Sequence, residues 1–492
     1  MEKYLLGIDV GTTGTKTMLF SENGSCVAHA YQGYVTHMPN VGWREQDPLD
    51  WWKAVVDTVH QTCSDPKIAQ AVVGISLSVQ GGTMVAVDDQ HQAVRPAMVW
   101  NDIRCEAQRA QFLQEVGPGE VMYHKTGWNL GRGMNALQIR WMRDNEPENF
   151  QKTAMFLSVP DYIAYKMTGI AALDLSNVGI NQLGDIREGK YDPQLLEFAG
   201  ITEKQLPKIA PSGKVIGKLT PEAAKELGLN PDCVLVSGAH DQYAVALGAG
   251  AVNDGDILIG SGTCWVVTAI GSKPDFQSGL AQSVAASEGM WGSLRSLSSG
   301  GGCLDWLRKG IADENSPLSY DMINQKASEI KAAEDGLFFY PFSGRCDEVT
   351  RFTRGTFVGL DLSHNRFHMA RAVMEGVVFQ IVWIMEQFST KPSEEGLILS
   401  GGASKSPLWR QLVADISGLP VRIPEAPDLA CVGAAILAGV GSGIFADTGE
   451  GYRRLAVSTE TILPNPEKTG QFRQLYEAYK ARAAALGAVY GL

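Results

Sequence analysis

The stretch Gly7-Ile8-Asp9-Val10-Gly11-Thr12-Thr13-Gly14-Thr15-Lys16 decides the fold of this chain. A buried strand over residues 4–10 ends in a carboxylate and a Gly-Thr turn, and a second strand follows through residues 18–20. Glycines let the backbone approach a ligand closely, and threonine hydroxyls and successive N–H groups can bind phosphate oxygens. Asp9 is then placed to hold a phosphate-bound Mg²⁺ through water. A tight hairpin rich in threonine for its strand propensity would look the same.

The opening pattern recurs in the middle of the chain as Ile259-Gly260-Ser261-Gly262-Thr263, which an apolar strand over 265–270 follows. Between and after the two copies, strand and helix patterns alternate, which is typical of α/β proteins. Residues 51–62, for example, have helical spacing, and residues 70–77 read as a strand. The sequence therefore predicts two α/β domains of similar design.

The predicted domains are residues 1–247 and residues 248–492, joined at the Gly/Ala-rich stretch 248–253. The second contains a final helical stretch, 471–489, and we allow for its packing back on the first domain. A chain of 492 residues is too long for one hydrophobic core, which agrees with a division of this kind.

Composition excludes several classes of function. The chain is 45% hydrophobic and 20% charged, as in ordinary soluble proteins. Its net charge of −12, with no run of Lys and Arg, argues against binding to nucleic acid or to a membrane surface. The eight cysteines form neither a Cys-x-x-Cys motif nor a Cys/His cluster, which indicates reduced thiols. The N-terminus lacks the apolar region of a signal peptide, and residues 431–446 read as a packed core helix. We expect a cytoplasmic protein.

A second candidate site is Ser237-Gly238-Ala239-His240-Asp241-Gln242, which follows the apolar strand 233–236. Asp241 lies just past a strand end, where α/β proteins place their ligands. Its carboxylate could accept a proton from an attacking hydroxyl group. The residues alone favour another interpretation, in which Asp241 caps the apolar helix that follows. His240 receives no role at this point.

Two glycine clusters stand at predicted helix starts, 298–302 and 400–404. Close backbone approach and a helix N-terminus suit the phosphates or the ribose of a nucleotide. Ordinary turns between a strand and a helix would look similar. Neither cluster fits the Walker pattern, and no G-x-G-x-x-G sequence follows the first strand.

The region 77–104 combines groups that a polyhydroxy ligand needs. Gln80, Gly81 and Gly82 form a turn between two strands, and Trp100-Asn101-Asp102-Ile103-Arg104 places an aromatic ring beside amide, carboxylate and guanidinium groups. Such groups can bond hydroxyls and cover C–H faces. A salt-bridged helix start is the alternative.

Taken in order, these motifs resemble the FGGY family of carbohydrate kinases, which share an actin-like, Hsp70-like ATPase core. The similarity covers essentially the whole chain and also includes the stretches 354–360 and 371–377. No single motif is decisive, but the ordered combination is highly specific. The resemblance implies an α/β fold of two actin-like, ribonuclease-H-like domains that face a central cleft for ATP and a sugar. The sequence is most similar to the xylulokinase branch.

The resemblance also implies site residues. By position, the family's catalytic base falls on Asp241 and its metal-associated aspartate on Asp9. The implied nucleotide-binding residues are Gly11, Thr12, Thr13, Lys16, Gly262, Thr263, Gly301, Gly302, Gly402 and Ala403. The implied substrate-binding residues are Gln80, Gly81, Gly82, Trp100, Asn101, Asp102 and Gln242. The implied cofactors are ATP and Mg²⁺, the partner is a small sugar or polyol, and a homodimer is compatible with the resemblance.

One departure affects the substrate. Xylulokinases usually have a Met-His pair after the glutamine, where this chain has Gly81 and Gly82, and we expect a roomier pocket with fewer donors. The expected activity is ATP-dependent phosphorylation of a hydroxyl on a pentulose such as D-xylulose. The alternatives are a kinase for another ketose, sugar acid or polyol, and, more remotely, a non-catalytic protein that binds ATP as a switch.

Overall fold

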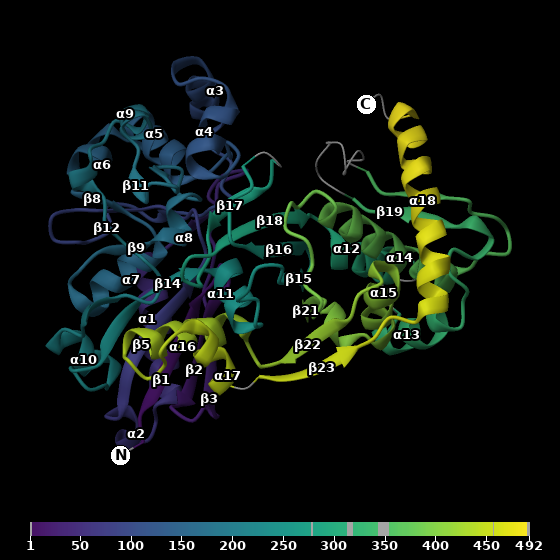
Figure 1. Ribbon diagram of the computed structural model, residues 1–492. Helices are drawn as coiled ribbons and strands as arrows, with labels where there is room; N and C mark the ends of the chain where they lie inside the picture. The colour runs from purple at the N-terminus through teal and green to yellow at the C-terminus, as the bar shows by residue number, and fades with distance from the viewer. Residues whose placement is uncertain (1, 277–278, 312–317, 343–353, 456, 490–492) are drawn as a thin grey trace. The chain divides into compact units, whose positions relative to one another are not determined.

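The computed structural model describes residues 2–276, 279–311, 318–342, 354–455 and 457–489. The chain ends Met1 and Leu492 and the eighth cysteine, Cys346, lie outside these ranges, and the other seven cysteines are free thiols. The chain forms two compact units (Figure 1). Unit 1 contains residues 1–253, 271–293 and 426–457, and unit 2 contains residues 254–270, 294–425 and 458–492. The predicted division near residue 248 treats each half as contiguous, whereas the compact units take segments from both halves.

Unit 1 is built on a mixed sheet with the strand order β13-β14-β5-β1-β2-β3. Strand β1 pairs antiparallel with β2 and parallel with β5, and β5 pairs parallel with β14. The carboxyl ends of β1, β5 and β14 therefore meet at one edge of the sheet, where such folds place ligands. The strand bounds are β1 Tyr4–Val10, β2 Gly14–Ser21, β3 Cys26–Gly33, β5 Val72–Val79, β13 Val215–Lys218 and β14 Val234–His240.

Strand β1 is buried on both faces, which explains its continuous apolar sequence. Leu6, Ile8 and Val10 belong to a core with helices α1 (Pro48–Thr62) and α7 (Val159–Thr168). Helix α1 confirms the helix predicted over 51–62, and Asp47 caps its first turn. Because side chains alternate along a strand, Gly7 and Asp9 face the opposite way, toward helix α16 (Leu429–Gly441).

Helix α16 comes from late in the chain and lies over the strands of the first residues (Figure 1). Its close approach depends on glycine. A Cβ at Gly7 would meet Cys431 O at 1.9 Å, and a Cβ at Gly433 would meet Ala244 O, in helix α11 (Asp241–Gly248), at 2.0 Å. The Gly/Ala-rich sequence is thus a packing requirement, and the predicted core helix is confirmed, with residues 430–439 buried.

Residues between β6 and β13 form a second, mainly helical core in unit 1. Its apolar residues include Phe112, Leu137, Met142 and Leu195. The principal helices are α3 Glu106–Glu115, α4 Gly119–Thr126, α5 Asn135–Asn145, α6 Pro147–Lys152 and α9 Pro193–Ala199. The short strands β6 (Val85–Val87) and β8 (Met155–Leu157) pair with each other, and β9 (Ala172–Asp174) pairs with β12 (Lys208–Ala210).

Unit 2 repeats the central arrangement of unit 1. Its sheet runs in the order β18-β16-β15-β21-β22-β23, and β15 pairs antiparallel with β16 and parallel with β21, as β1 does with β2 and β5. Both β1 and β15 end in a Gly-Thr turn, which confirms the repeat predicted from the sequence. The bounds are β15 Ile257–Ser261, β16 Trp265–Gly271, β18 Trp291–Leu297, β21 Leu397–Gly401, β22 Val421–Glu425 and β23 Ser458–Ile462.

Helices of unit 2 pack around α14 (Arg366–Met385), which contacts α13 (Tyr320–Ser328) and α15 (Pro407–Ser417). The final helix, α18 (Pro466–Val489), packs on α15, and α12 spans Gly300–Trp306. Among the described residues, α14 alone is long and apolar enough to cross a membrane. Its apolar window is 72% buried inside the protein, as in the core helix of a folded domain.

Candidate functional site

Asp9 lies near the carboxyl end of β1 with partners that strand pairing supplies. Register places it opposite Lys16 on β2 and Ser78 on β5. The Ser78 hydroxyl donates to Asp9 Oδ1 at 2.7 Å, and Lys16 Nζ lies 3.6 Å from Oδ2. Burial raises the pKa of Asp9 to about 7, and the charge of Asp428 adds to the rise, while Lys16 and Ser78 oppose it. Lys16 therefore neutralises the Asp9 carboxylate only in part.

Asp428 is the residue that competes for Lys16. It caps α16, accepting a hydrogen bond from Cys431 N on Oδ1 at 3.0 Å, and its Oδ2 lies 2.6 Å from Lys16 Nζ. Burial lowers the pKa of Lys16, but Asp428 and then Asp9 raise it more, so the net shift is upward and Lys16 is a cation. Unit 1 thus holds one lysine between two carboxylates beside the first Gly-Thr turn, a charge balance that suits an added cation.

Asp241 stands at the junction of β14 and α11. His240 occupies the cap position of α11 and makes no side-chain cap bond, so Asp241 is the first residue inside the helix rather than its cap. Gln242 Nε2 donates to Asp241 Oδ1 at 3.2 Å, and His240 Nε2 lies 3.4 Å from the same oxygen. Neither contact uses Oδ2, and 34% of the side chain is exposed.

The turn after β5 is connected to the first Gly-Thr turn by amide groups. Gln80 is buried, and its Nε2 donates to Gln46 Oε1 at 3.3 Å. Gln46 Nε2 in turn donates to Thr12 O at 2.7 Å, and Trp100 Nε1 donates to Thr12 Oγ1 at 3.0 Å. The Trp100 side chain remains substantially exposed, and Asn101 is exposed. The structure therefore gathers Gln80, Thr12 and Trp100 in one place.

Three loops of unit 2 surround a cavity of about 450 Å³. The turn after β15, the start of α12 and the loop after β21 are tied by backbone bonds: Gly301 N donates to Gly262 O at 3.2 Å, and Gly402 N donates to Ser261 O at 2.6 Å. A Cβ at Gly301 would meet Gly262 O at 2.4 Å, so the loops require glycine to lie this close. The lining includes the predicted Gly262, Thr263, Gly301, Gly402 and Ala403.

The same cavity combines apolar and polar walls. Ile323 and Trp409 supply apolar surface, and Asn324 and Ser406 supply hydrogen-bonding groups. Gly302 is not among the lining residues, and its N–H donates to Thr263 O at 3.1 Å. Gly262 and Thr263 are exposed at the turn after β15, and a polar turn with an apolar wall beside it fits a nucleoside phosphate.

Two family models together match most of the chain. Residues 4–248 match the model of the N-terminal domain of the FGGY family of carbohydrate kinases, and residues 256–442 match the model of its C-terminal domain. The chain belongs to the FGGY family of carbohydrate kinases.

Relatives extend over nearly the whole chain. The gluconokinase of Bacillus subtilis is 28% identical over 490 residues, covering 96% of this chain and 94% of its own, and the xylulose kinase of Escherichia coli is 31% identical over 445 residues, covering 88% and 89%. The crystal structure of the xylulose kinase from Rhodospirillum rubrum superposes with a TM-score of 0.90 at 27% identity and covers 100% of both chains. The predicted family and two-domain α/β fold are confirmed.

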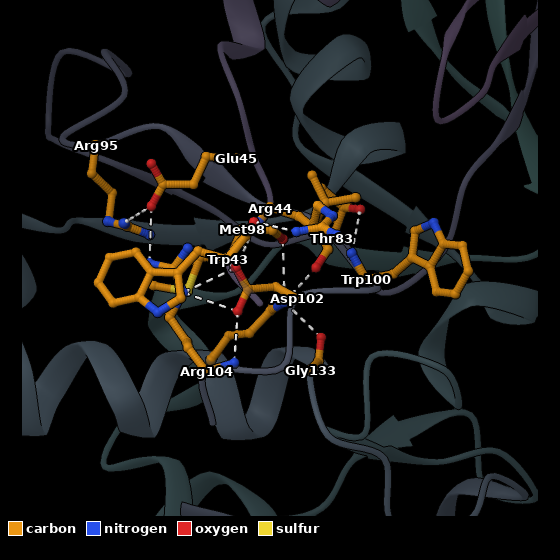
Figure 2. A network of polar contacts seen from close by, with 12 residues as sticks. Trp43, Arg44, Glu45, Thr83, Arg95, Met98, Trp100, Asp102, Arg104 and Gly133 are labelled. Atoms are coloured by element: carbon orange, nitrogen blue, oxygen red, sulfur yellow. Dashed lines mark hydrogen bonds and ion pairs between the residues drawn. The ribbon is translucent and has the colours of Figure 1, made fainter. Parts of the chain in front are cut away.

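Within this FGGY chain, Asp102 does not lie open to a ligand. It is fully buried, and it forms an ion pair with Arg104, whose Nη2 lies 2.6 Å from Asp102 Oδ2. The backbone N–H of Arg44 also donates to Oδ2, at 2.6 Å, and Arg104 Cζ lies 3.7 Å above the Trp43 ring. In Figure 2 the indole of Trp100 points away from this cluster. The substrate contact predicted for Asp102 is at odds with this burial.

The expected extra room beside Gly81 and Gly82 is not open, which corrects the sequence interpretation. A Cβ at Gly81 would meet His240 Cδ2 at 2.6 Å and Ile180 at 2.8 Å. A Cβ at Gly82 would meet Met134 Sδ at 2.7 Å, and its φ of +72° also favours glycine. Side chains from distant parts of unit 1 fill the space that the missing side chains leave.

Sequence reasoning gave no role to two polar residues near the proposed site. Asp428 shows only a helix-cap signal in the sequence, because its partner Lys16 is 412 positions away. His240 was noticed and left without a role. Its buried side chain lies beside both Gly81 and Asp241.

Proposed function

We propose that this protein transfers the γ-phosphoryl group of ATP to a hydroxyl of a small sugar, with Asp241 as the base. The observation that carries the proposal is the placement of Asp241. Gln242 Nε2 donates to its Oδ1 and His240 Nε2 lies 3.4 Å from the same oxygen, while Oδ2 is outside both contacts and the side chain is partly exposed. A base needs this combination of fixed orientation and one available oxygen.

The residues also fit the two groups that such a reaction needs. The cavity of unit 2 offers glycine turns and an apolar wall for the nucleotide. In unit 1, Asp9 and Asp428 share the single charge of Lys16, which favours a further cation, and Asp9 would hold Mg²⁺ through water. When bound, Mg²⁺ supplies positive charge to the phosphate oxygens.

In the proposed transfer one bond forms, one bond breaks and one proton moves. The acceptor hydroxyl gives its proton to Asp241 Oδ2 as its oxygen forms a bond to the γ-phosphorus, and the bond from that phosphorus to ADP breaks. Gln242 and His240 keep the carboxylate oriented through Oδ1. Lys16 and the Gly-Thr turns would bind phosphate oxygens, which fits the positive charge of Lys16 and the exposure of Thr13 and Thr263.

For the acceptor we propose a pentulose such as D-xylulose, because xylulose kinases are among the relatives that span the chain. Gluconokinase is a relative of similar identity, so a sugar acid is the principal alternative, followed by another ketose or a polyol. ADP release should be measured with D-xylulose, L-xylulose, D-ribulose, L-ribulose, gluconate, glycerol and erythritol. A protein that uses ATP only as a switch would show no sugar-dependent release.

The base assignment is tested by Asp241→Asn with the best substrate of that panel. We expect kcat to fall by about 10²–10⁴, since a positioned base contributes that much, while ATP binding and the melting temperature are retained. The amide keeps the shape of the carboxylate but cannot take the proton. Near-normal turnover in this variant would falsify the assignment.

A further inference from the structure

His240 is a buried histidine immediately before the proposed base. Only 6% of its side chain is exposed, and its backbone N–H donates to Ser176 Oγ at 2.8 Å. Its ring centroid lies 5.9 Å from that of Trp128 and 5.8 Å from that of Tyr243. The imidazole is therefore held in one place by packing and by its own backbone bond.

The two ring nitrogens have different surroundings. Nε2 lies 3.4 Å from Asp241 Oδ1, and Nδ1 has no hydrogen-bond partner among the described residues. A carboxylate only accepts hydrogen bonds, so the tautomer with hydrogen on Nε2 is the favourable one. The other tautomer would direct two lone pairs at each other and bury an N–H without a partner.

This contact decides which oxygen of Asp241 is available. His240 Nε2 and Gln242 Nε2 both approach Oδ1, from residues on either side of Asp241 in the chain. The Gln242 bond, and an N–H of His240 directed at the same oxygen, would fix the rotation of the carboxylate and leave Oδ2 for the acceptor hydroxyl. A distance of 3.4 Å is long for a hydrogen bond, but such contacts often tighten when substrate binds.

Gly81 makes room for the ring. A Cβ at this position would lie 2.6 Å from His240 Cδ2, closer than such contacts occur. The φ of Gly81 is not in the left-handed region, so glycine is required here by space and not by backbone conformation. A side chain at position 81 would require the imidazole, together with Ile180 at 2.8 Å, to shift.

We propose that His240 is a positioning residue that holds Asp241 through Oδ1, and that glycine at position 81 serves to admit its imidazole. The inference rests on the proposed function, in which Asp241 is the base. His240 itself touches no reacting atom in this account. His240 affects the fraction of time that Asp241 Oδ2 is directed at the acceptor hydroxyl. A substitution of His240 should therefore alter kcat more than the KM for ATP.

The first test compares His240→Phe with His240→Gln. Phenylalanine fills the volume without a donor, and we expect kcat to fall about 10- to 100-fold, the range for a lost hydrogen bond to a charged group, with the KM for ATP within about twofold. Glutamine can place an N–H near Oδ1, and we expect it to restore most of the loss. Tyr243→Phe is the matched control, since it removes a buried hydroxyl bonded to Gly292 O beside the same ring, and its kcat should be unchanged.

The second test is a double-mutant cycle between positions 81 and 240. Gly81→Ala should lower kcat as His240→Phe does, because its Cβ pushes the imidazole away. In a His240→Ala background the ring is absent, and adding Gly81→Ala should have little further effect. Melting temperatures measured on every variant separate loss of fold from loss of turnover.

The outcomes distinguish this inference from the proposed function. If Asp241→Asn abolishes turnover but His240→Phe keeps a normal kcat, the role of His240 is overturned and the base assignment stands. The same conclusion follows if the effects of the substitutions at positions 81 and 240 on kcat are additive. If Asp241→Asn itself turns over normally, the proposed function fails first. Loss in His240→Phe with recovery in His240→Gln supports the positioning role.

Discussion

Asp102 and Asp9 are both buried aspartates of unit 1, and the structure treats them in opposite ways. Asp102 receives the Arg104 guanidinium and two backbone N–H groups, those of Arg44 and Arg104, so both of its oxygens are satisfied. Asp9 receives one hydroxyl, from Ser78, and a lysine at 3.6 Å that Asp428 holds more closely.

This difference fits a structural role for Asp102 and the cation-binding role proposed for Asp9. Asp102 and Arg104 compensate each other, and Glu45 and Trp43 complete the enclosure of the guanidinium (Figure 2). Burial, and then the negative charge of Asp428, raise the pKa of Asp9, and Lys16 offsets the rise only in part. Asp9 and Asp102 are buried to nearly the same extent. The number and charge of their partners therefore distinguish the two carboxylates.

We expect the largest effect on stability from Asp102→Ala. Removing one partner of a buried ion pair leaves Arg104 as an uncompensated charge, which costs about 3–5 kcal/mol. We expect the melting temperature to fall by about 6–20 °C. Below its transition the variant should retain kcat and the KM for sugar within a few-fold. A variant that melts like wild type but loses sugar affinity would restore Asp102 to the substrate site.

A second prediction uses the raised pKa of Asp9. Its value is about 7 in the folded protein and about 3.9 in an unfolded chain, so the folded state holds an extra proton between these values. The stability that this group contributes is therefore full below about pH 4 and is lost as the pH rises through 7.

The matching experiment is Asp9→Asn, melted beside wild type without Mg²⁺ or nucleotide. The variant has no carboxylate to ionise, so its advantage in melting temperature should grow from pH 5 to pH 8, by about 2–4 °C for each kcal/mol. The Ser78 bond can be kept by the amide oxygen. A difference that stays constant across this pH range would mean that Asp9 titrates normally.

Much of the frame around these aspartates is predictable from sequence. The strand before each Gly-Thr turn, the helix over 51–62 and the Gly/Ala-rich core helix follow from local periodicity, and local periodicity reflects burial on one or both faces. The repeat at 259–263 indicated two similar domains for the same reason. These features depend on residues that are near in sequence.

The site depends on residues that are far apart in sequence. The pattern around Asp102 is the same for a sugar-binding turn and for a salt-bridged helix start, and only the partners from residues 43–45 separate the two. Gly81 suggested empty space because His240 and Ile180, which fill that space, come from other elements. Packing of α16 on β1 brings Asp428 to Lys16, and no local pattern contains that contact.

The smallest expected effect is that of Asp428→Asn, and it tests whether Lys16 belongs to the nucleotide site. Asparagine is as good a helix cap as aspartate, so the bond from Cys431 N is kept and stability should change by less than about 1 kcal/mol. Without the negative charge of Asp428, more of the positive charge of Lys16 is available to a phosphate group. We expect ADP without Mg²⁺ to bind about 1.5- to 5-fold more tightly by calorimetric titration, the range for a partly exposed ion pair.

The control for that experiment is Asp428→Ala, which removes the charge and the cap together. It should show the same gain in ADP affinity and a further loss of about 1 kcal/mol in stability, because the first turn of α16 loses its acceptor. If ADP affinity is unchanged in both variants, the Lys16–Asp428 pair acts only on the packing of α16. Lys16 would then neutralise Asp9 and Asp428 in part without reaching the nucleotide, and Asp9 alone would remain as the residue of this group proposed to hold a ligand.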